Sequence, residues 1–231
     1  MSRQFRLKLD RTETFRPEDY VVSPANAEAV KAVESWPAWP LGNALALIGS
    51  EGSGKSHLAA TWAATAGAAI IPAKGKVDLG ALNGRPVLYE DADRDRPRRD
   101  EILFHVFNMA AHAGGGLLIT GRTPPSGWSV ALPDLRSRLN AVTVAQLEEP
   151  DDAILEAMLR KFFRERNIRP TEDVFPYLLR RIERSAPKAL EMVQRLDEAA
   201  DAEGRPVSRA LARQILETDP QTLNLFDENP G

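Results

Sequence analysis

The feature that most constrains this chain is the run GSEGSGKS at positions 49–56, which matches the pattern G-x-x-x-x-G-K-[ST] in full. The apolar run Ala44–Ile48 before it is too short for a helix and predicts a buried strand, whereas Lys55–Thr65 after it predicts a helix. Glycines let the backbone turn so tightly that successive N–H groups point at phosphate oxygens, and the helix start adds its positive end. We therefore expect a phosphate-binding loop between a strand and a helix.

This loop carries the residue types that a bound nucleotide needs. Lys55 can reach the β- and γ-phosphates, and the hydroxyl of Ser56 can take a place on Mg²⁺. A glycine-rich turn without a ligand is the alternative, but a chance match in a chain this long is on the order of one in a hundred. The residues expected to contact the nucleotide here are Gly49, Ser50, Glu51, Gly52, Ser53, Gly54, Lys55, Ser56 and His57.

Strand and helix patterns alternate over the first two thirds of the chain. Such alternation predicts a parallel sheet of five strands with helices on both faces. Ser23 and Pro24 read as the cap and first turn of the first helix. The predicted strands are Ala44–Ile48, Ala68–Ile71, Pro86–Tyr89, Leu117–Thr120 and Ala141–Ala145, and the predicted helices are Ala25–Trp36, Lys55–Thr65, Arg98–Ala113 and Leu132–Asn140.

After Pro150 the pattern becomes entirely helical, with predicted helices at Asp151–Arg166, Glu172–Arg184, Pro187–Ala202 and Ser208–Glu217. We therefore expect an α/β base domain over residues 14–149 and a small all-α lid over residues 150–217. Residues 1–13 form an N-terminal segment, and residues 218–231 form a tail.

Composition argues against several classes of protein. The chain has no cysteine, which rules out a disulfide framework and a thiolate zinc site. No stretch approaches the roughly 20 apolar residues of a membrane span, and the N-terminus lacks the apolar run of a signal peptide, so we expect a cytoplasmic protein. The net charge of −3 argues against DNA as the main partner, and we expect no sequence-specific DNA binding.

Two carboxylates follow the third predicted strand, at Glu90 and Asp91. In a nucleotide-hydrolysing site one such carboxylate holds the shell of Mg²⁺ and the next orients the attacking water. We assign Glu90 to the first role and Asp91 to the second. Glu90 is one methylene longer than the aspartate usual at this place, so we expect weak or absent hydrolysis by the chain itself. From Asp93 onward the acidic run reads as a solvated turn.

Several further segments resemble the AAA+ module of the replication initiator DnaA, and more closely the Hda family of DnaA-related regulators. They cover about residues 14–217. The segment 14–22 resembles the one that lines the adenine pocket, 117–125 the sensor I strand with Thr120 as its polar residue, 132–139 the box of the arginine finger, and 184–185 sensor II. By this resemblance the residues at the nucleotide are Tyr20, Val21, Val22 and Arg184, and the finger is Arg138.

The resemblance implies a negative regulator of replication initiation that binds ADP or ATP with Mg²⁺. Its partner would be DnaA. By inserting Arg138 in trans, the protein would stimulate hydrolysis of the ATP bound to DnaA, and such a finger raises the hydrolysis rate by about 10³–10⁵. The first residues fit the form Q-x-x-L-x-[LF] of peptides that dock on the DNA polymerase III sliding clamp (β), with Gln4, Phe5, Leu7 and Leu9 as its contacts. Head-to-tail assembly in this class also makes a homo-oligomer possible.

Other interpretations remain open from the sequence. The apolar residues that alternate with charged ones at the N-terminus also fit an ordinary edge strand. Arg136, Arg138 and Arg184 could each be a solvent-exposed charge on a helix. The segment 222–226 resembles a second clamp peptide with its glutamine out of place, and fits better as a packing segment. Only 14 residues follow Glu217, too few for the DNA-binding domain of an initiator. A helicase loader and a small-molecule kinase with a phosphate-binding loop are the alternative functions.

Overall fold

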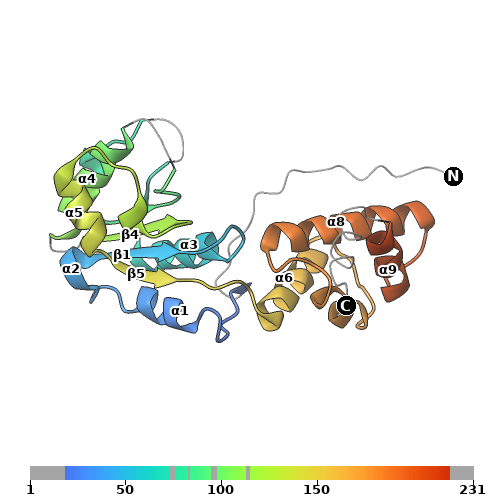
Figure 1. Ribbon diagram of the computed structural model, residues 1–231. Coiled ribbons are helices and arrows are strands. Elements are labelled where there is room, and N and C mark those ends of the chain that lie inside the picture. The colour runs from blue at the N-terminus through green and yellow to red at the C-terminus, as the bar shows by residue number, and fades with distance from the viewer. Residues whose placement is uncertain (1–18, 73–75, 83, 95–97, 113–114, 219–231) are drawn as a thin grey trace.

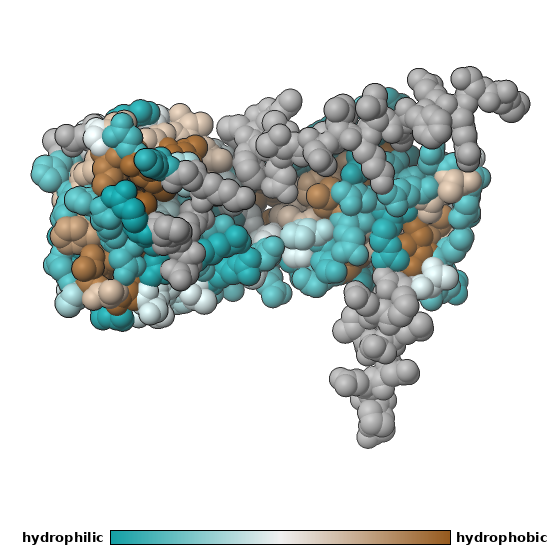
Figure 2. Space-filling model, turned by 90° about the horizontal axis from the view of Figure 1, so that it is seen from above, coloured by the Kyte–Doolittle hydropathy of each residue, from teal (hydrophilic) through white to brown (hydrophobic). Residues whose placement is uncertain are grey.

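The computed structural model describes residues 19–72, 76–82, 84–94, 98–112 and 115–218 of the chain. Its helices and strands form two lobes joined end to end (Figure 1). One lobe contains a sheet with helices on both sides, and the other contains only helices. Seen from above, hydrophilic residues make up much of the face of the helical lobe (Figure 2). In the part of the chain that the structure describes, no helix is long and apolar enough to cross a membrane.

A single sheet of five parallel strands organises the first lobe, as the sequence predicts. The strands lie in the order β2-β3-β4-β1-β5. Parallel strands end at the same edge of a sheet, so the segments after β1, β3 and β4 become neighbours. The strands are β1 (Ala44–Ile48), β2 (Ala69–Ile70), β3 (Pro86–Tyr89), β4 (Gly116–Gly121) and β5 (Thr143–Gln146).

Alternate side chains along the three inner strands, β1, β3 and β4, enter different hydrophobic cores, as the period of two dictates. On β1, Leu45 and Leu47 join a core with helices α1 (Ala27–Glu34) and α3 (Lys55–Ala66). The alternate residues of β1 join the opposite core, with α4 (Arg99–Ala110) and α5 (Pro133–Ala141). All five residues of β1 are buried, which is why its sequence is apolar without alternation.

The helical lobe has its own core, which is built from α6 (Asp152–Glu165), α7 (Val174–Leu179), α8 (Ala186–Glu203) and α9 (Arg209–Glu217). Three of these helices begin at a residue whose side chain accepts a hydrogen bond from the first turn. The caps are Asp151, Ser185 and Ser208. Each cap satisfies one of the backbone N–H groups that a helix start leaves unpaired.

Some predicted boundaries are wrong. Helix α1 begins at Ala27 rather than two residues earlier, because Ser23 donates its N–H to the side chain of Asn26 and is held in a turn. Helix α5 runs on to Ala141, so β5 begins later than predicted. Helix α7 covers only part of the predicted stretch, and a short helix, α2 (Pro40–Asn43), lies where the sequence predicts none.

Candidate functional site

The loop at 49–56 lies between β1 and α3, at the carboxyl edge of the sheet. Only glycine fits at its first position, because a Cβ atom on Gly49 would lie 2.8 Å from the carbonyl oxygen of Leu147. Gly54 takes a left-handed conformation (φ +99°) immediately before the first residue of α3. The loop is therefore followed directly by the N-terminus of a helix, an arrangement that favours the binding of an anion.

Lys55 turns its side chain back over this loop. Its ammonium nitrogen donates hydrogen bonds to the carbonyl oxygens of Gly49 (2.8 Å) and Ser50 (2.7 Å), and the residue is only 8% exposed. Burial lowers the pKa of Lys55 and the charge of Arg122 adds to this, whereas the carboxylates of Asp91, Asp93 and Glu51 oppose it. The site therefore holds a partly desolvated cation ringed by charged groups.

The two serines at the end of the loop differ in burial: Ser53 is buried, whereas Ser56 is exposed. Ser53 is buried, and its hydroxyl has no hydrogen-bond partner, so an acceptor or donor at the loop would satisfy it. Ser56, whose hydroxyl is predicted to bind Mg²⁺, is exposed on the first turn of α3.

The two carboxylates after β3 occupy different positions. Asp91 takes a left-handed backbone conformation (φ +49°) and donates its N–H to the hydroxyl oxygen of Thr120 at 2.9 Å. Its carboxylate acts on Lys55 and forms an ion pair with Arg94 at 3.3 Å. Glu90 is half-buried. Asp91 therefore lies close enough to the phosphate loop for its charge to act on Lys55.

Two further residues complete this edge: Arg122, to which the sequence analysis gave no role, and Asp93, which it wrongly placed in a solvated turn. The backbone N–H of Arg122 donates to a carboxylate oxygen of Asp93 at 2.7 Å, and its guanidinium lies 2.5 Å from the carboxylate of Glu51. The other oxygen of Asp93 is buried without a partner. Arg122 directly follows β4 and Asp93 lies in the turn after β3, and this was a usable signal, because neighbouring parallel strands end side by side.

The segment predicted to line the adenine pocket lies against the phosphate loop. The ring of Tyr20 meets the ring of His57 edge to face, with centroids 5.1 Å apart, and lies close to Gly54. Burial raises the pKa of Tyr20 to about 12, although its hydrogen bond with Asn26 lowers it. The carbonyl oxygen of Val21 accepts a hydrogen bond from Asn26, and Val22 is 57% exposed. This segment thus places an aromatic ring and an exposed apolar side chain near the loop.

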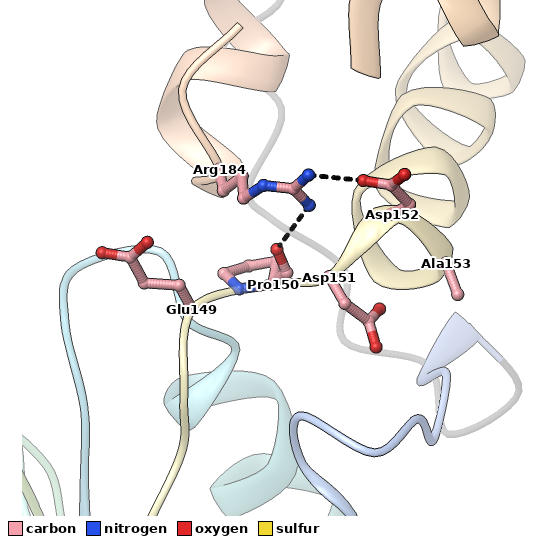
Figure 3. Close-up of a pocket in the computed structure, with 6 residues that line it drawn as sticks. All are labelled: Glu149, Pro150, Asp151, Asp152, Ala153 and Arg184. Carbon is pink, nitrogen blue, oxygen red and sulfur yellow. Dashed lines mark hydrogen bonds and ion pairs between the residues drawn. The ribbon is translucent and has the colours of Figure 1, made fainter. Parts of the chain in front are cut away.

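The helical lobe reaches the phosphate loop through the start of α8. The backbone N–H of Ala186 donates to the carbonyl oxygen of Gly52 at 3.3 Å. Arg184 lies just before this point, but its guanidinium bonds to Asp152 (2.5 Å) and to the carbonyl oxygen of Pro150 (3.3 Å). These residues line an open pocket of about 550 Å³ between the starts of α6 and α8 (Figure 3). Arg184 therefore lies beside the loop, held by the connection between the lobes.

Arg138 lies elsewhere, on α5 at the end of the first lobe that faces away from the lid helices (Figure 1). It forms an ion pair with Asp134 at 3.0 Å, and its guanidinium lies 5.5 Å from the centroid of the Phe104 ring. About a third of its side chain is exposed. The proposed clamp contacts Gln4, Phe5, Leu7 and Leu9, and the segment 222–226, lie outside the described residues.

A nucleotide with Mg²⁺ fits the residues of the phosphate loop. The unpartnered hydroxyl of Ser53 could donate to a phosphate oxygen, and the ammonium of Lys55 could exchange its two carbonyl acceptors for phosphate oxygens. Among the described residues no three His, Cys, Asp or Glu side chains form a metal cluster.

Comparison with known proteins identifies the fold. No family model matches the chain. Domain III of the Thermotoga maritima replication initiator DnaA superposes with a TM-score of 0.68 at 20% identity, over 89% of this chain and 98% of that one. AMPPCP-bound DnaA from Aquifex aeolicus gives 0.60 at 19% identity, over 83% and 68%. A variant of RuvB from Thermotoga maritima gives 0.62 at 15% identity, over 84% and 67%. The chain therefore has the AAA+ fold shared by DnaA and RuvB, as its sequence predicts.

Proposed function

We propose that the chain binds an adenine nucleotide, ADP or ATP with Mg²⁺, on the loop 49–56 and beneath the start of α8. The observation that carries this proposal is the buried amine of Lys55 on a complete phosphate loop at a helix N-terminus. Tyr20 and His57 supply apolar surface for a base. Ser56 and Glu90 would supply oxygens for the metal shell, and Asp91 would orient the attacking water. DnaA from Aquifex aeolicus, which has the same fold, is bound to AMPPCP, and this supports a nucleotide as the ligand of this chain.

We further propose that the protein is a negative regulator of replication initiation that acts on ATP bound by DnaA. Arg138 is the group that would act, as an arginine finger. It is part-exposed on α5, whereas the phosphate loop of the same molecule contacts the lid at the other end of the lobe (Figure 1). This separation supports action on the nucleotide of a neighbouring subunit. A guanidinium there would neutralise the charge that develops on the γ-phosphate.

Docking on the sliding clamp completes the proposed function. Gln4, Phe5, Leu7 and Leu9 lie outside the described residues, so this step rests on the sequence pattern and on the resemblance to the Hda family. A peptide that places alternating apolar side chains in a preformed pocket would tether the protein to DNA without sequence-specific contacts. The tether would raise the local concentration of Arg138 near DnaA.

One experiment tests both steps. Hydrolysis of ATP preloaded on DnaA is followed with this protein and with clamp loaded on DNA. We expect wild type to accelerate hydrolysis, and Arg138→Ala and Gln4→Ala to lose the effect. Arg136→Ala is the matched control, since Arg136 is an exposed arginine on the same helix. If wild type does not change the rate of hydrolysis of DnaA-bound ATP, the regulatory function is contradicted. If Arg136→Ala also loses the acceleration, the positive charge of α5 as a whole is responsible and Arg138 has no specific role.

A further inference from the structure

The exposed arginines of the lid differ in whether a carboxylate neutralises them. Some are paired, as Arg160 is with Glu172 at 2.7 Å and Arg213 is with Glu217 at 2.6 Å. Others are exposed and form no ion pair with any residue that the structure describes. These are Arg169, Arg180, Arg181 and Arg209, which we call the arginine cluster.

Two members of the cluster share one aromatic ring. The guanidinium of Arg181 lies 4.0 Å from the centroid of the Tyr177 ring, and that of Arg209 lies 5.5 Å from the same centroid. Tyr177 is buried and belongs to the core of the lid, so it gives both side chains a rigid support. A guanidinium over a ring keeps N–H groups at its edge available for acceptors.

The fold gathers the cluster where α7 meets α9. These two helices pack against each other, and Arg180 and Arg181 directly follow α7. The N–H of Thr171 donates to the carbonyl oxygen of Val207 at 3.1 Å, so the segment that carries Arg169 lies beside the chain that leads into α9. Helix α9 lies at the end of the lid that is far from the sheet (Figure 1). The cluster is therefore separate from Arg138.

The arrangement favours an anionic ligand. Arg181 and Arg209 carry like charges over one ring, and these charges repel each other. An anion that bridges the two guanidinium groups would relieve this repulsion. Phosphate is the matching anion, because a guanidinium donates two parallel hydrogen bonds to its oxygens.

We propose that the arginine cluster binds the phosphate backbone of nucleic acid without reading its sequence. The large apolar side chains that are exposed among the described residues all lie outside the lid, at Val22, Ile70, Leu132 and Val144. A membrane surface or an acidic protein usually also engages apolar anchors. A nucleic-acid backbone, in contrast, is bound mainly through charge and polar contacts to phosphates.

The test is the affinity of the full chain for a fluorescent DNA duplex of arbitrary sequence, measured by anisotropy at several salt concentrations. Each phosphate that is neutralised contributes roughly 0.9 to the slope of log affinity against log salt concentration. The double variant Arg181→Gln, Arg209→Gln should therefore lower this slope by about 2 and weaken binding to every duplex sequence alike.

Arg164→Gln is the matched control. It removes an exposed positive charge from the same lobe, but one that is already paired with Asp19 at 2.6 Å. We expect this variant to keep the slope and the affinity of wild type. Equal melting temperatures of the variants would show that an altered slope does not come from unfolding.

The outcomes decide between the possible partners. If wild type does not bind the duplex, or if the double variant keeps the wild-type slope, the inference is wrong. It is also wrong if vesicles of anionic lipid or polyglutamate bind the cluster more tightly than the duplex does, because the partner is then a membrane or an acidic protein. The experiment uses neither nucleotide, DnaA nor clamp, so its failure leaves the proposed function untouched.

Discussion

The N–H of Ala186 donates a hydrogen bond to the carbonyl oxygen of Gly52, so the first turn of lid helix α8 lies directly on the phosphate loop. Gly52 has a left-handed backbone (φ +77°), and a Cβ atom on it would lie 2.5 Å from Cδ of Pro187 and 2.8 Å from the nitrogen of Ala186. The contact thus depends on the absence of a side chain. It couples the lid to the loop that is proposed to hold phosphate.

We expect Gly52→Ala to separate the lid from the loop and to weaken ADP binding. Gly67→Ala is the control, because Gly67 is also left-handed (φ +62°) but has nothing within 4 Å of its would-be Cβ atom. The control should cost about 1 kcal/mol of stability for the strained backbone alone. Calorimetry and thermal denaturation measure the two effects. Equal losses in both variants would show that the contact with α8 has no influence on the site.

Nucleotide affinity should depend on pH through Lys55. Burial lowers its pKa below the ordinary 10.5, and a bound phosphate would favour the charged amine and raise it. Binding then takes up a proton between the two pKa values, so affinity falls as pH rises through the lowered pKa. For the free protein the sign is opposite: the unfolded chain binds more protons in this window, so Lys55 makes stability rise with pH.

Titrations with ADP from neutral pH towards pH 10 measure this dependence. Lys55→Arg is the comparison, because a guanidinium keeps its charge across the range. Tyr20 does not interfere, since its pKa is raised to about 12. Affinity that stays constant for wild type, or that falls equally for the arginine variant, would assign the pH effect to other groups.

Asp151 should stabilise the start of the lid. Its carboxylate accepts the N–H of Ile154 at 3.0 Å, and burial, which disfavours its charge, is outweighed by hydrogen bonds from Ile154, Ser23, Ala153 and Ala25, so its pKa is lowered from 3.8. We expect Asp151→Ala to cost about 1 kcal/mol. Because the folded-state pKa is depressed, this contribution is complete above pH 3.8 and is lost as pH falls through the lowered value.

Urea denaturation at neutral and acidic pH measures the difference. Asp152→Ala is the neighbouring control, since Asp152 pairs with the part-exposed Arg184 and caps no helix. If Asp151→Ala lowers the free energy of unfolding by the same amount at neutral and acidic pH, the packing of the side chain rather than its charge stabilises the lid.

Thr120 should hold the acidic turn in place. It is 1% exposed, and its hydroxyl oxygen accepts the N–H of Asp91. Thr120→Val keeps the shape but leaves that N–H without its acceptor, which should cost roughly 1–3 kcal/mol. Denaturation by urea measures this, with Thr143→Val on β5 as control. An unchanged free energy of unfolding would mean that water replaces the hydroxyl.

The sequence predicts those parts of the site that are local in the chain. Lys55 and Ser56 follow from one motif. The helices predicted at Asp151–Arg166 and Ser208–Glu217 begin one residue before the observed starts of α6 and α9. The strands of the sheet were predicted because each is a short apolar run between turn-forming residues. A parallel arrangement places the carboxyl ends of the strands at one edge, and the strand order, which the structure gives, decides which ends are neighbours.

Features that depend on distant pairing were not predicted. The contacts of Arg122 with Glu51 and Asp93 need the register of β4 beside β1 and β3. Helix α7 stops at Leu179 although the helical pattern continues, and the chain then turns so that the start of α8 reaches Gly52. Such tertiary contacts override local helix propensity.

The central claim is that the loop at 49–56 binds an adenine nucleotide, and titration of the full chain with ADP and Mg²⁺ tests it most directly. Lys55→Ala is measured beside wild type, with thermal denaturation to verify that the variant is folded. We predict saturable binding by wild type and its loss in the folded variant. Absence of binding by wild type, or equal binding by both proteins, would contradict the claim.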